Sequence, residues 1–321
     1  MTSRTIGGFL PFELPTCEGD LPLDGSMPFA SGRACIRAVL DELRPARLYA
    51  PFYVCDAALA PAIAVGVPIV FYAIDGALEP EIQEAPLPND LVLVVDYFGL
   101  KPNLYERFAH LGDRVIFDQT QAFFGTALRS SWRFTSARKW FGVPDGGFLW
   151  GPRRLPYPQP APLRQCPTHL IERRWGDAAE AYKAFQRSEA LFRPEADPIS
   201  LESRAVLAGV SATRVREIRL HNFSVLKRRL ERHNQLRLTV TEETVPFCYP
   251  FLPERGLSRE RLAKDGIFVP KYWNDCELRA RPDFAWEMEL SRGLLPLPID
   301  HRYGTDDMLR IADAVEALLA E

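Results

Sequence analysis

A lysine in an unusual local setting is the first residue of this sequence that suggests chemistry. Lys139 lies in the stretch SARKWFGVPDGGFLW, which spans residues 136–150. A Gly-Val-Pro-Asp-Gly-Gly turn leads from it into an apolar strand. A surface lysine needs none of this context, whereas a lysine that forms an imine at the end of a strand pair needs most of it. We predict that Lys139 is a reactive amine and that Trp140 and Phe141 pack to fix its loop.

Two further stretches supply groups that would suit the same ligand, a phosphorylated pyridine aldehyde. SGRA, residues 31–34, opens a predicted helix, where free backbone N–H groups and the positive end of the helix dipole favour a phosphate. In VIFDQTQAFF, Asp118 falls at the carboxyl end of a buried strand, where open parallel sheets bind their ligands. A carboxylate there could keep a pyridine nitrogen protonated, so that the ring withdraws electrons from a bound substrate carbon.

The elements that must position these residues alternate between helix-like and strand-like runs. This alternation predicts an α/β fold with a mostly parallel central sheet and covering helices. The strand-like runs are almost continuously apolar, as is typical of strands covered on both faces. The predicted helices are 31–43 and 55–66, and the predicted strands are 47–53, 68–74, 90–99 and 113–118.

The second half of the chain changes character after residue 151. The proline-rich stretch 152–167 predicts a connecting loop, and 172–192 and 199–236 predict helices, the second of these more than one. Strands are predicted at 245–252, 266–270 and 294–299, followed by a final helix with Thr305 as its N-cap. We predict a large ligand-binding domain at 1–210, and a linking helix with a small C-terminal α/β domain at 211–321.

Composition and missing motifs exclude several other classes of function. The net charge of -3 gives no support for a nucleic-acid partner. The six cysteines form no CxxC pair, so we expect reduced thiols and no metal site. No nucleotide-binding glycine motif, HExxH or GxSxG occurs. Without a membrane span or an export signal in the sequence, we expect a soluble cytoplasmic protein.

The order of these stretches resembles that of fold-type I enzymes that use pyridoxal 5'-phosphate (PLP). That order is SGRA, then a strand ending in D-x-x-Q, then S-x-x-K followed by a G-x-x-x-G-G strand. Within this group, IFDQTQAFFG and the C-terminal GLLPLPIDHRYGTDDMLRIADAVEALL resemble the DegT/StrS-type sugar aminotransferases. The likeness covers most of the chain from about Phe29.

This resemblance implies a role for individual residues. Lys139 would be the Schiff-base lysine and proton shuttle, and Asp118 would partner the pyridine nitrogen. Gln121 would bond the phenolic oxygen of the ring. The phosphate would be held by the backbone of Gly32, Arg33 and Ala34 and by the hydroxyl of Ser136.

Some residues keep two interpretations. The family places an aromatic ring against the cofactor in the register that this chain fills with Cys55, so Tyr53 could substitute, although core packing is the commoner role of a buried tyrosine. Arg138 could neutralise the phosphate or form a surface ion pair. Arg302 could bind a substrate carboxylate or be a surface arginine. The basic residues of 219–234 favour a solvated helix face.

The leading functional hypothesis is a PLP-dependent aminotransferase. The resemblance implies glutamate as the amino donor, a nucleotide-linked keto-sugar for surface glycan biosynthesis as the acceptor, and a homodimer with its active sites at the interface. Another fold-type I reaction, such as that of a lyase, decarboxylase or aldolase, is an alternative, because fold and cofactor do not fix the reaction. A degenerate, non-catalytic protein of this fold is the second alternative, and it predicts erosion at Lys139 or Asp118.

Overall fold

A large mixed sheet forms the centre of the protein. The computed structural model describes residues 18–321 except 102, 127–128, 164–166, 242–243 and 280. The sheet has the strand order β1-β8-β7-β6-β5-β2-β3-β4. Strands β2, β3, β5, β6 and β7 are parallel, while β1, β8 and β4 run antiparallel to their neighbours. The strands are β1 (Met27–Phe29), β2 (Leu48–Pro51), β3 (Ile69–Ile74), β4 (Pro80–Glu81), β5 (Leu91–Val95), β6 (Val115–Asp118), β7 (Trp132–Ser136) and β8 (Gly147–Trp150).

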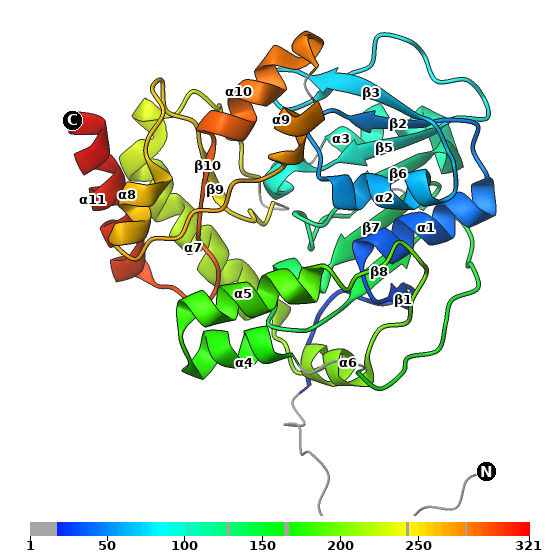
Figure 1. Ribbon diagram of the computed structural model, residues 1–321, viewed down its shortest axis with the longest axis horizontal. Coiled ribbons are helices and arrows are strands. Elements are labelled where there is room, and N and C mark those ends of the chain that lie inside the picture. The colour runs from blue at the N-terminus through cyan, green and yellow to red at the C-terminus, as the bar shows by residue number, and fades with distance from the viewer. Residues whose placement is uncertain (1–17, 102, 127–128, 164–166, 242–243, 280) are drawn as a thin grey trace, which may run out of the picture.

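The central strands are buried on both faces, as their apolar sequences predict. Every residue of β2, β5 and β6 is buried. Helices α1 (Gly32–Leu43) and α2 (Asp56–Ala64) lie together on one face of the sheet (Figure 1). The remaining helices are α3 (Leu104–Arg107), α4 (Thr168–Trp175), α5 (Ala178–Glu189), α6 (Leu201–Leu207), α7 (Ala212–Leu230), α8 (Arg259–Lys264), α9 (Asp275–Arg279), α10 (Ala285–Gly293) and α11 (Thr305–Ala320).

The start of helix α1 is fixed by a cap and by a close backbone approach. The Ser31 side chain accepts a hydrogen bond from the backbone N–H of Ala34, so Ser31 is the N-cap. The first residue of β8 runs so close to this point that a Cβ on Gly147 would lie 2.3 Å from the Ser31 carbonyl oxygen. Gly146 has φ +132°, which L side chains rarely adopt. The glycine pair after Asp145 therefore meets both a turn requirement and a packing requirement.

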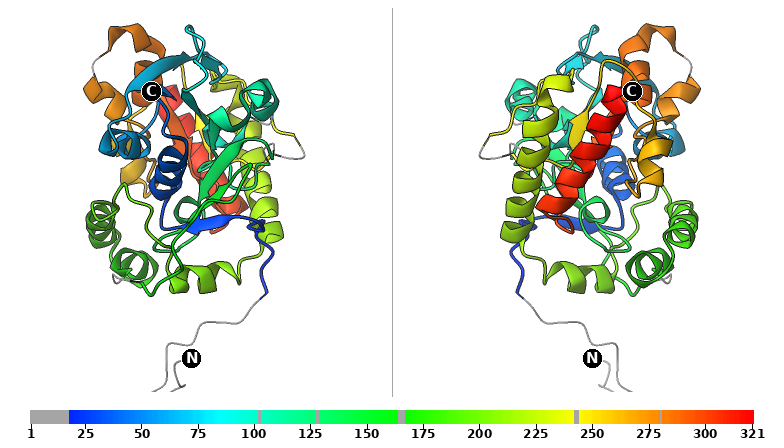
Figure 2. Two further views of the ribbon diagram at one scale, coloured as in Figure 1. Left: turned by 90° about the vertical axis from the view of Figure 1, so that its right-hand side faces the viewer. Right: turned by 90° about the vertical axis from the view of Figure 1, so that its left-hand side faces the viewer.

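The C-terminal part carries a second, small sheet of β9 (Tyr249–Phe251) and β10 (Leu295–Leu297), which pair antiparallel. Figure 2 shows α7 and α11 running side by side. Arg229 on α7 joins them by ion pairs with Asp313 and Glu316. Asn222, also on α7, is fully buried and donates to the carbonyl oxygens of Ile299, Asp300 and Tyr303.

The predicted helices and strands are largely confirmed, with three corrections. Residues 172–192, predicted as one helix, belong to two helices, α4 and α5, which are separated at Gly176 and Asp177. Residues 266–270, predicted as a strand, have no strand partner in the described part of the chain. The side chain of Phe268 is 61% exposed and Pro270 has no N–H to donate, so this stretch lacks the burial and the pairing that a central strand requires. The final helix begins at Thr305 with Gly304 as its N-cap, and the Asp307 carboxylate accepts from the Gly304 N–H at 3.0 Å. The domain boundary at 210/211 stays a prediction.

We expect Asn222→Ala to destabilise the protein by about 2–3 kcal/mol, because the buried carbonyl oxygen of Ile299 and the partly buried carbonyl oxygens of Asp300 and Tyr303 lose their donor. Urea unfolding followed by circular dichroism measures the change. Glu217→Ala, at an exposed position on the same helix, is the matched control. Equal unfolding midpoints for the two variants would show that the Asn222 contacts do not hold α7 to the segment before α11.

Candidate functional site

The site begins where two parallel strands end at the same edge of the sheet. Asp118 is the last residue of β6 and pairs in register with Phe134 of β7. Strand β7 ends two residues later at Ser136, and a single 3-10 turn, Ala137–Lys139, follows. Parallel pairing therefore places the lysine turn beside the loop that leaves Asp118. The structure brings together the two residues predicted to be catalytic.

Thr120 is the contact that joins them. The Lys139 Nζ donates to the Thr120 Oγ1 at 2.8 Å, and the Thr120 N–H donates to the Asp118 Oδ1 at 2.8 Å. The Trp140 Nε1 donates to the Thr120 carbonyl oxygen at 3.0 Å. Asp118 and Thr120 are buried, whereas Lys139 is exposed in the single chain. Thr120 was not among the predicted site residues.

The start of α1 lies against the same loop. A Cβ on Gly32 would lie 3.0 Å from the Phe134 ring and 3.5 Å from the Thr120 methyl carbon. The Ala34 N–H already donates to the Ser31 side chain, so it is less available to a phosphate than predicted. Within the described residues, the N–H groups of Gly32 and Arg33 have no acceptor, as is usual in the first turn of a helix. The Ser136 hydroxyl makes no hydrogen bond to a described residue either.

Two arginines near the site are held by the end of α5 instead of facing Lys139. The Arg138 guanidinium pairs with Glu189 and lies 4.0 Å over the Phe192 ring. The Arg33 guanidinium pairs with Glu189 at 3.5 Å and donates to the Phe192 carbonyl oxygen. The ion-pair interpretation of Arg138 is the one that the structure supports.

Gln121 has a structural partner as well as its predicted role. Its Oε1 accepts from the Phe98 N–H at 3.1 Å, and Phe98 adopts a left-handed conformation with φ 63°. This bond holds the turn Tyr97–Gly99, which follows β5. The Gln121 amide nitrogen donates to no described residue, so it can still serve a ligand.

Tyr53 packs in the aromatic core, whereas Cys55 lies within electrostatic reach of Lys139 and Asp118. Tyr53 is buried in an aromatic cluster, with its ring centroid 5.8 Å from that of Tyr97 and 4.6 Å from that of Trp273. This environment agrees with core packing, and its role as a ring platform stays a prediction. Cys55 precedes α2, and burial raises the pKa of its thiol, while the charge of Lys139 lowers that pKa and the charge of Asp118 raises it. Cys55 is therefore within electrostatic reach of both residues and keeps its proton at neutral pH.

A buried polar network lies behind Asp118. Asp96 follows β5, and its backbone N–H donates to the Asp118 carbonyl oxygen at 3.0 Å. The Asp96 carboxylate accepts from the Tyr105 hydroxyl, which in turn accepts from the Gln119 Nε2. Burial raises the pKa of Asp96 to about 6, against the lowering effect of the Tyr105 hydrogen bond. No sequence pattern singled out this network.

Arg302 fits one of its two sequence interpretations, the surface arginine, whereas the prediction of a solvated face that includes Arg219 is wrong. The Arg302 guanidinium donates two hydrogen bonds to the Asp300 carboxylate, from Nε to Oδ1 at 2.6 Å and from Nη2 to Oδ2 at 2.9 Å. The charge of Arg302 is therefore already paired. Arg219 belongs to the predicted solvated face of α7 but is 1% exposed. Its guanidinium lies 4.2 Å over the Trp140 ring and donates to the Phe247 carbonyl oxygen, and burial lowers its pKa to about 10. The Arg219 side chain therefore braces the residue that follows Lys139.

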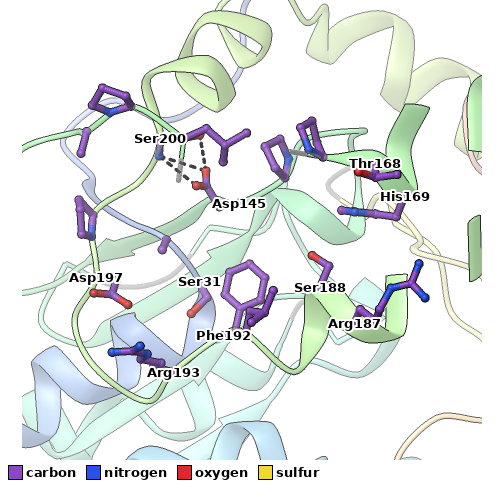
Figure 3. Close-up of a pocket in the computed structure, with 18 of the residues that line it drawn as sticks. Ser31, Asp145, Thr168, His169, Arg187, Ser188, Phe192, Arg193, Asp197 and Ser200 are labelled. Atoms are coloured by element: carbon purple, nitrogen blue, oxygen red, sulfur yellow. Dashed lines mark hydrogen bonds between the residues drawn. The ribbon is translucent and has the colours of Figure 1, made fainter. Parts of the chain in front are cut away.

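A cavity of about 310 Å³ adjoins the start of α1 (Figure 3). Ser31, the end of α5 and the loop before α6 line it, and Asp145 on its wall accepts from the Ser200 backbone N–H and hydroxyl. Neither Lys139 nor Asp118 lines it. The cavity thus borders the start of α1 at Ser31, and the lysine is not part of its lining.

Comparison with solved structures identifies the fold. A sugar aminotransferase, CalS13, from Micromonospora echinospora has a TM-score of 0.64 at 16% identity over 92% of this chain and 88% of its own. A DegT DnrJ EryC1 StrS aminotransferase from Brucella abortus scores 0.61 at 17% identity over 92% and 86%. The PLP form of a putative sugar aminotransferase, Spr1654, from Streptococcus pneumoniae scores 0.65 at 15% identity over 93% and 88%.

The chain has the fold of these aminotransferases. The predicted fold class, fold type I with a mostly parallel sheet, is confirmed, as is the resemblance to DegT/StrS-type enzymes at the level of fold. No protein-family model matches the sequence. No curated protein matches it either. In the described residues, no helix of this aminotransferase fold is long and apolar enough to cross a membrane, and no cluster of candidate metal ligands occurs.

The buried Asp96 predicts a specific pH dependence of stability. From pH 3.8, the ordinary pKa, to about 6, the unfolded chain releases this proton while the folded chain keeps it, so rising pH favours unfolding. Relative to Asp96→Asn, the wild type should lose about 3 kcal/mol between about pH 4 and pH 7. Urea unfolding across this range measures the difference, with the exposed Asp24→Asn as control. A difference that is constant with pH would mean that folding does not shift the pKa of Asp96.

Proposed function

We propose that the protein is a PLP-dependent aminotransferase. The observation that carries this proposal is the placement of the Lys139 amine, which a buried hydroxyl holds beside Asp118 and the start of α1. The fold of solved sugar aminotransferases supports it. Lys139 and Asp118 are both present, contrary to what a degenerate protein of this fold predicts.

The residues of the site fit this cofactor. Glycine at position 32 leaves open the space that a Cβ would fill between α1 and the Thr120 methyl group. The Gly32 and Arg33 N–H groups and the Ser136 hydroxyl can donate to a phosphate. The Asp118 Oδ2 accepts no hydrogen bond from a described residue, so it can pair with a protonated ring nitrogen. The Gln121 amide nitrogen can donate to the phenolic oxygen.

The chemistry divides between the cofactor and this chain. When bound, PLP draws electrons from a substrate carbon, which makes the proton on that carbon acidic. Lys139 Nζ is the group that holds and moves this proton, because an amine accepts a proton as a base and returns it as an acid. The buried Asp118 carboxylate stabilises positive charge at the sheet edge. We also propose glutamate as the amino donor and a nucleotide-linked keto-sugar as the acceptor. The solved sugar aminotransferases of the same fold support a sugar acceptor.

We expect wild-type protein mixed with PLP and then borohydride to carry one stable label at Lys139, and Lys139→Ala to carry none. Absorbance and peptide mass spectrometry measure the label, and Lys264→Ala, an exposed lysine on α8, is the control. Adding L-glutamate to wild-type protein that has been mixed with PLP, without borohydride, should release 2-oxoglutarate. A labelled Lys139 without 2-oxoglutarate from any common amino donor would leave a PLP protein that is not an aminotransferase.

A homodimer is the assembly that the surface of the single chain supports. Five large apolar side chains on α4, α5 and the segment that follows are exposed: Ile171, Trp175, Tyr182, Phe185 and Leu191. Apolar residues gathered in this way mark interaction surfaces. Helix α5 also lines the cavity beside Ser31, so a second copy seated on these helices would adjoin the site. It could also cover the exposed Lys139.

We expect Trp175→Glu to convert a dimer to a monomer, because the substitution buries a charge in the interface. Sedimentation velocity at micromolar concentration measures the change. Leu278→Glu is the control, since Leu278 is 83% exposed on α9, away from this surface. A monomeric wild type would contradict the proposed assembly directly.

A further inference from the structure

The Thr120 hydroxyl contacts the reactive amine of Lys139. Thr120 is buried, and its Oγ1 lies 2.8 Å from the Lys139 Nζ. Its orientation does not depend on that contact alone. The backbone N–H is bound to Asp118, the carbonyl oxygen is bound to Trp140, and the methyl group faces Gly32. The hydroxyl is therefore held at one point relative to the carboxylate, the lysine turn and α1.

A hydroxyl suits an amine that changes its protonation state. It accepts a hydrogen bond from an ammonium group and can donate one to a neutral amine, whereas an ionised carboxylate can only accept. A neutral hydroxyl also avoids the ion pair that a carboxylate would form with the lysine. The amine can then leave the contact without breaking a buried salt bridge.

The loop geometry remains in place without the hydroxyl. The Trp140 indole joins the lysine turn to the Thr120 backbone, and Arg219 braces that indole from α7. The bond from the Thr120 N–H to Asp118 is also a backbone contact. Replacing the hydroxyl with a methyl group therefore tests the contact to Lys139 with little effect on the surrounding fold.

We propose that Thr120 is a positioning residue for Lys139, whose hydroxyl holds the free amine in place whenever Lys139 is not covalently joined to the cofactor. This inference rests on the proposed function. In this position Nζ is held by a residue that also contacts Asp118 and the start of α1, the groups proposed to hold the cofactor. No proton passes to the Thr120 hydroxyl, so the hydroxyl changes no covalent bond and gains no charge. Its effect is on how often the amine is correctly oriented.

The experiment compares Thr120→Val, which keeps the shape, with Thr120→Ser, which keeps the hydroxyl. Rapid mixing with PLP, followed by absorbance, measures the rate at which Lys139 captures the cofactor. Binding of pyridoxamine 5'-phosphate, which cannot join to the lysine, measures the affinity of the remaining contacts. Thr135→Val is the matched control, because it removes a buried hydroxyl bonded to the Gln119 carbonyl oxygen, without contact to Lys139.

We expect Thr120→Val to capture PLP about 10-fold more slowly, with unchanged affinity for pyridoxamine 5'-phosphate. Single-turnover transfer from L-glutamate should slow by a similar factor, with a larger isotope effect for 2-deuterated glutamate, because proton movement by Lys139 becomes more rate-limiting. Thr120→Ser and Thr135→Val should resemble the wild type.

The outcomes separate this inference from the proposed function. Equal capture and transfer rates for Thr120→Val and wild type overturn the positioning role alone. Slow capture in Thr120→Ser as well would assign the effect to shape and also overturn it. Slow capture only in Thr120→Val, without glutamate turnover in the wild type, supports the positioning role and rejects the aminotransferase. A wild type that captures no PLP rejects both.

Discussion

Parallel pairing of β6 with β7 is the constraint on which the site depends. It ends both strands at one edge of the sheet, so the residues that follow them must meet. Asp118 ends the first strand, and the turn that carries Lys139 follows the second. Neither loop would hold its side chain in place alone, because loops lack the regular hydrogen bonding of a strand. The sheet edge supplies the fixed positions, and Thr120 links them.

The sequence predicted the fold well because its signals are local and repeated. Apolar runs such as 91–95 and the capped start of α1 at Ser31 carry their structure in their own residues. The order of Asp118 and Lys139 along the chain placed both at one sheet edge. Residues 266–270 show the limit of this approach, since a β-rich composition cannot reveal whether a partner strand exists.

The residues that sequence reasoning missed act through contacts between distant segments. Arg219 resembles its basic neighbours on α7, and only the packing of α7 against Trp140 buries it. Asp96 is connected to Tyr105 and Gln119 through side chains from three separate segments. Glu189 forms ion pairs with Arg138 and Arg33, each of which lies more than 50 residues away in the sequence. No spacing rule within one element contains such information. Thr120 is different, because it lies inside a recognised motif, and only its contact to Nζ in the structure distinguishes it.

The brace between α7 and the lysine turn also limits how the molecule can move. Arg219 lies over Trp140 while it donates to the Phe247 carbonyl oxygen, and its burial makes separation from these partners costly. Helix α7, the lysine turn and the segment at Phe247 are therefore held to one another by a buried guanidinium. A motion that keeps these contacts would carry the three segments together, whereas a motion that separates them would leave the Arg219 charge buried without its partners.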